Sequence, residues 1–141
     1  MTELDSPARL LSRYRHRAQR EAKRPGRVRS IARRAGAKLR EHRDQLGTLR
    51  DDLPVLLRLA RAWARGDYRA IPWKSLVLLV AGLLYFLAPA DAVPDFIPVL
   101  GFLDDAAVIA YVLRAIQTDV RAFEEWEAEA DAARALPPPG A

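Results

Sequence analysis

The stretch LVLLVAGLLYFLA, residues 76–88, runs for thirteen residues without a charge. Extended back to residue 72, it gives 17 residues, or about 25 Å of α-helix at a rise of 1.5 Å per residue. The hydrocarbon core of a bilayer is roughly 30 Å thick, so the length is borderline for a membrane crossing. Trp73 and Lys74 precede the run and suit a membrane interface, where an indole ring and a snorkelling lysine help a short helix to span.

A second apolar region follows, and aspartates and prolines interrupt it. A carboxylate in apolar surroundings is unfavourable unless it caps a helix, pairs with a cation or binds a ligand. Two aspartates at the centre of a spanning helix would cost about 2.5 to 3.5 kcal/mol each. We therefore expect a turn over residues 98–103 and a new helix from Asp104 to about Trp126. Residues 72–88 and 104–120 would then form a helical hairpin. The second apolar region covers residues 96–116, and the residues that interrupt it are Pro98, Gly101, Asp104 and Asp105; Pro89, Asp91, Pro94 and Asp95 precede it.

Two interpretations of the four aspartates stay open. In the first, each aspartate caps a helix or stabilises a turn by accepting hydrogen bonds from backbone amides, and Pro89, Pro94, Pro98 and Gly101 shape the turn. In the second, Asp91, Asp95, Asp104 and Asp105 converge on one site that binds a hard divalent cation or shares a proton. The sequence leaves a metal undecided and gives no reason to expect a cofactor. It contains no recognisable catalytic constellation, so we expect no enzymatic activity.

The charge of the chain is divided unevenly. Residues 1–74 hold 20 Lys and Arg against 8 Asp and Glu, whereas residues 75–141 hold 3 against 10. The basic residues concentrate in residues 9–43, within an N-terminal arm over residues 1–48. Val28, Ile31, Ala35, Leu39, Leu46 and Leu49 form a narrow helical stripe along this arm. We expect the arm to be helical or partly disordered, and to stay solvated until it meets a polyanion.

The rest of the chain has a helical pattern without strand or hairpin signals, so we expect an all-α fold. Asp51, Asp52 and Pro54 open a short amphipathic helix that ends at Gly66. We divide the chain into the arm, a helical membrane domain over residues 49–126, and an acidic tail over residues 127–141 that ends in prolines. The chain has no cysteine, which excludes disulfides, thiolate nucleophiles and cysteine metal sites.

The segment APADAVPDFIPVLGFLDD, residues 88–105, resembles the signature of the YkvA-like family of small helical membrane proteins, a domain of unknown function. That signature is written around S-P-x-D-x-I-P-D-x-I-P-V-x-G-x-L-D-D, and the resemblance extends over about residues 49–126. Ala88 stands where the family has serine, and Val93 where it has isoleucine. The resemblance implies a multi-pass membrane protein with an anchoring or interaction role, and it brings no known activity.

These observations predict a small multi-pass membrane protein in which the hairpin inserts and the basic arm binds anionic lipid. Lysine and arginine ahead of the first helix orient the chain by the positive-inside rule, so both termini would be cytoplasmic. An unidentified membrane protein is a further possible partner. The alternatives are a soluble or peripheral helical protein whose arm binds nucleic acid without sequence specificity, and a cation or proton site at the aspartates.

Overall fold

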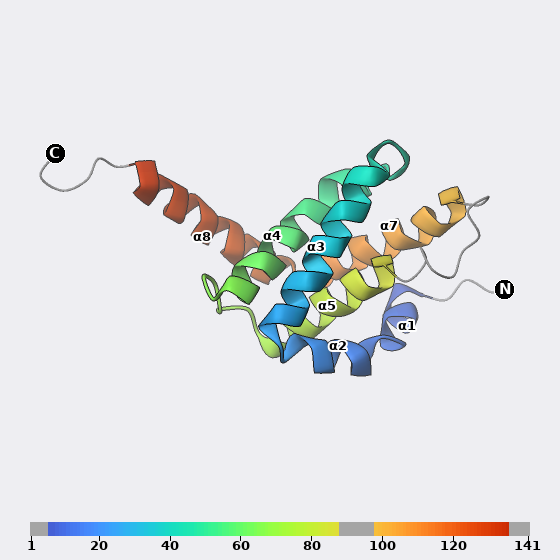
Figure 1. Ribbon diagram of the computed structural model, residues 1–141, viewed down its shortest axis with the longest axis horizontal. Coiled ribbons are helices and arrows are strands. Elements are labelled where there is room, and N and C mark those ends of the chain that lie inside the picture. Colours follow the sequence, from blue (N-terminus) through green and yellow to red (C-terminus); the bar gives the residue numbers. More distant parts are fainter. Residues whose placement is uncertain (1–5, 88–97, 136–141) are drawn as a thin grey trace, which may run out of the picture.

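The computed structural model describes residues 6–87 and 98–135, and within them it confirms the all-α fold. The helices pack in one bundle, from which the last one extends (Figure 1). In chain order they are α1 (Pro7–Ser12), α2 (Arg15–Ala22), α3 (Pro25–Glu41), the 3-10 helix η1 (Arg43–Gln45), α4 (Leu49–Arg65), α5 (Trp73–Leu87), α7 (Pro98–Ala115) and α8 (Gln117–Ala135).

Helix α5 lies at the centre of the bundle. It is apolar on every side, and a helix of this kind is stable only when its whole circumference is covered. Here α1, α2, α3, α4 and α7 all pack against it, as Figure 1 shows for α3 and α4 on one side and α2 on another. The residues of α5 that this packing buries are Leu76, Val77, Leu79, Val80, Ala81, Gly82, Leu83, Leu84 and Phe86.

The N-terminal arm forms part of the bundle. Leu46 and Leu49 are buried, but they lie beyond the end of α3 at Glu41. The predicted stripe is confirmed along α3 itself, where Val28, Ile31 and Ala35 form a buried side. Helix α3 packs against α4 and α5 through this side. The expectation that the arm stays solvated until a polyanion binds is therefore wrong. Its stripe is narrow, but α4 and α5 supply the apolar surface that the arm alone lacks.

Helix α4 is the amphipathic helix that the sequence predicts, but it begins at Leu49, so Pro54 lies inside it and not in its first turn. Asp51 and Asp52 lie in its first turn, and Leu53, Leu56 and Ala60 are among the residues on its buried side. Gly66 ends it with a φ of 84°, in the left-handed region that glycine adopts without a steric penalty. The backbone N–H of Gly66 bonds to the carbonyls of Ala62 and Trp63.

The C-terminal helices differ from the prediction in their boundaries. Helix α7 begins at Pro98 and not at Asp104, because proline at the first helical position has the right φ and needs no hydrogen-bond donor. The helical segment divides at Ile116, where no local residue explains the break. Helix α8 continues to Ala135, nine residues beyond the predicted end at Trp126. The alanine-rich sequence after Trp126 has a high helix propensity.

Helices α5 and α7 run in opposite directions and pack closely (Figure 1). A methyl group added at Gly82 of α5 would lie 3.0 Å from Cγ2 of Val112, so the glycine is what permits this approach. Val108, Ile109 and Val112 are all fully buried on the matching side of α7. The hairpin geometry thus appears in a bundle in which other helices cover α5.

Only the beginning of α8 belongs to the core. Val120 and Phe123 are buried, and Phe123 lies 5.2 Å from the ring of Tyr68, measured between ring centroids. The ring of Trp126 lies 5.2 Å from Tyr68 and 5.8 Å from Phe123. Beyond this cluster α8 extends away from the bundle toward the C-terminus (Figure 1).

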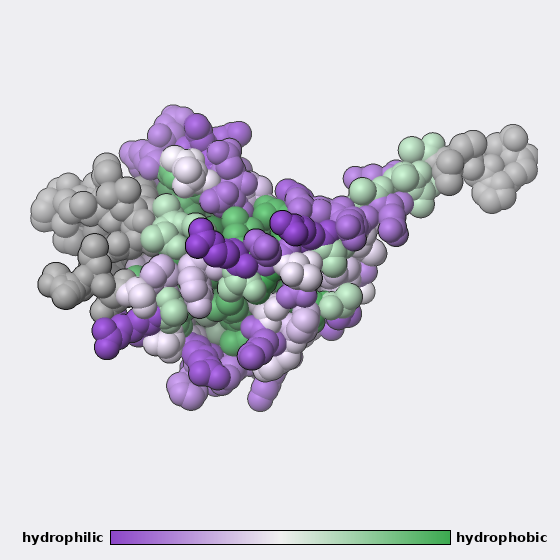
Figure 2. All heavy atoms as spheres, turned by 180° about the vertical axis from the view of Figure 1, so that it is seen from behind, coloured by the Kyte–Doolittle hydropathy of each residue, from purple (hydrophilic) through white to green (hydrophobic). Residues whose placement is uncertain are grey.

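Within residues 6–87 and 98–135, no helix combines the length and the apolar character needed to cross a bilayer. The predicted spanning helices over residues 72–88 and 104–120 are therefore not seen there. The surface is mixed: Figure 2 shows apolar side chains exposed at the centre of one face, with hydrophilic side chains around them.

Candidate functional site

The structure places one of the two aspartate pairs. Asp104 and Asp105 are the seventh and eighth residues of α7, so the prediction that Asp104 caps a helix N-terminus is wrong. The free amides of a helix lie in its first turn, which here begins at Pro98. Asp91 and Asp95 lie outside the described residues, and the convergent site stays a prediction. The described part of the chain contains no group of three potential metal-ligating side chains.

Two of the four predicted turn residues lie within the described residues. Pro98 and Gly101 lie in the first residues of α7, where the backbone is helical, so a turn at these two positions is wrong. A proline at the first position is compatible with a helix because the N–H it lacks would have no partner within the helix there, and a glycine costs only about 1 kcal/mol relative to alanine. Pro89 and Pro94 lie outside the described residues.

Helices α1 to α3 carry a dense array of exposed cations. Residues 7–41 contain 13 Lys and Arg against Glu21 and Glu41. Twelve of the 13 are exposed, while the apolar stripe of the same helices points into the bundle. We call these twelve residues the basic surface: Arg9, Arg13, Arg15, Arg17, Arg20, Lys23, Arg24, Arg27, Arg29, Arg33, Arg34 and Arg40.

Glu21 offsets little of this charge, because it is paired within the surface. Arg27 donates from Nε to Oε1 at 3.1 Å and from a terminal nitrogen to Oε2 at 2.9 Å. The hydrogen bond from Arg27 is the main cause that lowers the pKa of Glu21, although burial opposes it. The pair joins the end of α2 to the start of α3.

Lys38 is the remaining cation of α3, and it is buried. Its Nζ donates a hydrogen bond to the carbonyl oxygen of Phe86 and lies 4.6 Å from the centre of the Phe86 ring. The last carbonyls of a helix lack partners within the helix, and a cation there also meets the negative end of the helix dipole. Lys38 therefore caps α5. Sequence reasoning missed this role, although Ile31, Ala35 and Lys38 follow one another at the spacing of a single helix face.

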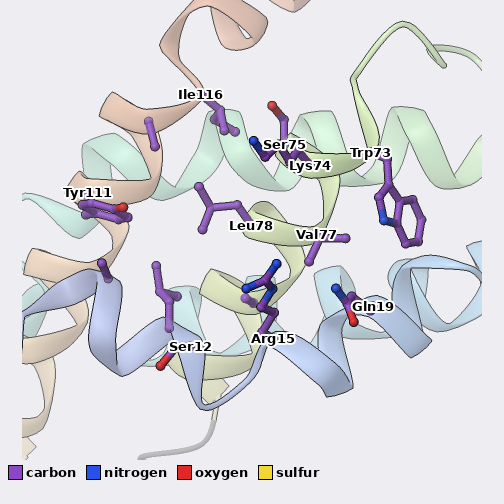
Figure 3. Close-up of a pocket in the computed structure, with 14 residues that line it drawn as sticks. Ser12, Arg15, Gln19, Trp73, Lys74, Ser75, Val77, Leu78, Tyr111 and Ile116 are labelled. Carbon is purple, nitrogen blue, oxygen red and sulfur yellow. The ribbon is translucent and has the colours of Figure 1, made fainter.

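Trp73 and Lys74, the predicted interface residues, are both exposed and line a groove of about 650 Å³. The groove lies between α1, α2, the first half of α5 and the end of α7. Figure 3 shows Trp73 and Tyr111 at opposite sides of it, with Arg15 directed from α2 toward α5. Arg15 and Tyr111 each lie far along the chain from residue 73, and only the fold brings the three residues to one groove.

Comparison with known proteins identifies the relatives of this chain. Residues 75–111 match the family described as "Protein of unknown function (DUF1232)", a match that covers most of α5 and of α7. A Bacillus subtilis (strain 168) protein, "Uncharacterized membrane protein YkvA", is 38% identical over 74 residues, which are 52% of this chain and 70% of the relative. No solved structure gives a significant match. The chain therefore belongs to the YkvA-like DUF1232 family.

Proposed function

We propose that this protein is a membrane-associated helical module that docks on anionic lipid through the basic surface, without enzymatic activity of its own. The single observation that carries the proposal is the exposure of twelve of the 13 Lys and Arg of residues 7–41 on helices whose other side is buried. A folded basic surface loses little conformational freedom on binding, unlike a disordered arm. A lysine or arginine near an anionic leaflet contributes about 1 kcal/mol.

The family relationship adds support for a membrane location, because the Bacillus subtilis relative is described as a membrane protein. The cytoplasmic leaflet is the one rich in anionic lipid, so both termini would lie on the cytoplasmic side. The protein would act as an anchoring or interaction module there, with an unidentified membrane protein as a possible partner.

Insertion of the α5 and α7 hairpin is a different membrane state of the same module. It would require α5 to exchange its contacts with α2, α3 and α4 for lipid. Extraction of membranes with alkaline carbonate separates the two states. Release of the protein supports peripheral docking, and retention in the membrane pellet supports the inserted hairpin.

Docking itself is tested by co-sedimentation with vesicles of phosphatidylglycerol, and with vesicles of phosphatidylcholine for comparison. The double variant Arg33→Glu/Arg34→Glu should lower the partition coefficient by about tenfold or more, because both residues are part of the basic surface. The matched control Arg65→Glu/Arg121→Glu changes the net charge equally at exposed positions outside that surface, and it should lower partition by less than about threefold.

The salt dependence gives a second readout. Wild-type binding to phosphatidylglycerol should disappear near 1 M salt, where the Debye length is only about 3 Å. Equal binding to both kinds of vesicle would contradict the proposal. Strong binding to duplex DNA by fluorescence anisotropy, with no binding to phosphatidylglycerol, would favour the nucleic-acid alternative instead.

A further inference from the structure

We propose that the groove between α1, α2, α5 and α7 holds an anionic phospholipid of the docked bilayer, with its acyl chain on the apolar floor and its phosphate beside Arg15 and Lys74. This inference rests on the proposed function, and it names the place on the protein where one lipid molecule of the bilayer binds. The volume of about 650 Å³ lies within the range of roughly 300 to 1,000 Å³ that is usual for small-molecule sites.

The floor of the groove suits an acyl chain. Leu11, Val77 and Ala81 are buried beneath it, and Leu78 is half-buried. These residues come from α1 and α5, so the apolar strip depends on the packing of the first helix against the central one. Hydrocarbon placed there would cover apolar surface that is otherwise partly in contact with water.

The rim of the groove carries the exposed large apolar side chains. Among the described residues, Trp73 and Tyr111 stand out in this respect, with exposures of 46% and 37%. Both line this groove, on opposite sides of it (Figure 3). Tryptophan and tyrosine are the residues that favour the headgroup level of a membrane, because each ring is apolar but carries a polar atom.

The charge of the groove complements an anionic headgroup. Its charged lining residues, among those that the structure describes, are Arg15 and Lys74, and Arg15 also belongs to the basic surface. The nearby carboxylate of Asp119 does not line the groove, and it accepts a hydrogen bond from Ser75, which does, at 2.5 Å. Figure 3 shows Arg15 directed toward Leu78, so a phosphate beside Arg15 leaves the lipid chain next to the apolar floor. The groove therefore adjoins the surface that attracts the membrane.

The test uses Trp73 as the probe. In the variant Trp63→Phe/Trp126→Phe the sole remaining tryptophan is Trp73, because the chain has three. Its emission is measured with phosphatidylglycerol vesicles that carry bromine on the acyl chain, at lipid concentrations that bind all of the protein. We expect a blue shift and quenching of Trp73. Quenching should be lost on introduction of Arg15→Glu and kept on introduction of Arg17→Glu.

Arg17 is a matched control because it lies on the same helix, is exposed, and does not line the groove. Both reversals should lower vesicle partition alike, by roughly fivefold or more, since both remove a cation of the basic surface. Binding without quenching of Trp73, or equal quenching in the two variants, would overturn the groove assignment and leave the proposed function intact. Absence of vesicle binding by the wild-type protein would overturn the proposed function and the groove together.

Discussion

Replacement of Leu79 by alanine measures how far α5 acts as the centre of a folded bundle. Leu79 is fully buried, whereas its neighbour Leu78 is half-buried and faces the groove. Leu79→Ala deletes three carbon groups worth about 0.8 kcal/mol each and leaves a cavity, for a total loss of about 3 to 4 kcal/mol in the free energy of unfolding. Leu78→Ala should cost only about 1 kcal/mol, because part of the side chain is already solvated.

The assay is urea unfolding followed by circular dichroism at 222 nm. With a slope of about 2 kcal/mol per molar urea, the midpoint should fall by about 1.5 to 2 M for Leu79→Ala and by about 0.5 M for Leu78→Ala. The slope itself should stay unchanged, which shows that the two variants unfold from the same compact state. Equal midpoints for the two variants would refute the central position of α5.

Three further substitutions test other parts of the structure. Gly66→Ala should cost about 1 kcal/mol because φ is 84° there, while the control Gly26→Ala meets nothing within 4 Å and should leave the urea midpoint unchanged or higher. Glu21→Gln should cost about 1 kcal/mol at pH 7 by removing the pair with Arg27. The pKa of Glu21 is lowered in the folded state, so the stability that the ionised side chain contributes is complete above pH 4.5 and is lost as the pH falls through the folded pKa. A difference in urea midpoint between the wild type and Glu21→Gln that persists unchanged at lower pH would contradict this. Phe123→Ala should lower the free energy that holds α8 against the bundle by about 3 kcal/mol or more, and amide hydrogen exchange should speed up more in α8 than in α3 and α4. A uniform increase in exchange across all helices would contradict the local loss of packing.

The local features of the fold were predictable from the sequence. The stripe through Val28, Ile31 and Ala35 and the end of α4 at Gly66 depend on helical periodicity and on backbone preference, which neighbouring residues determine. The surroundings of α5 were not predictable. An apolar run that is covered by other helices has the same composition as one that is covered by lipid, so periodicity does not separate the two cases.

The same reason explains what sequence reasoning missed at the candidate site. Lys38 reads as one more cation in a basic segment, and only the packing of α3 on α5 brings it to the carbonyl of Phe86. The groove likewise combines Arg15, Trp73 and Tyr111 from three helices. Trp73 and Lys74 were identified from the sequence because they flank an apolar run. Residues in that position are expected both at a membrane interface and at the rim of an apolar groove.

The projection of α8 gives the molecule a direction. Its 19 residues contain six Asp and Glu against two Arg, and they extend away from the bundle whose helices α1 to α3 carry an excess of eleven positive charges. Such a separation amounts to a large electric dipole moment. The electric field of a negatively charged surface exerts a torque on this dipole, which turns the basic helices toward the surface and the tip of α8 away from it before any contact forms. Orientation would then precede docking, and α8 would be the end of the protein held farthest from the surface.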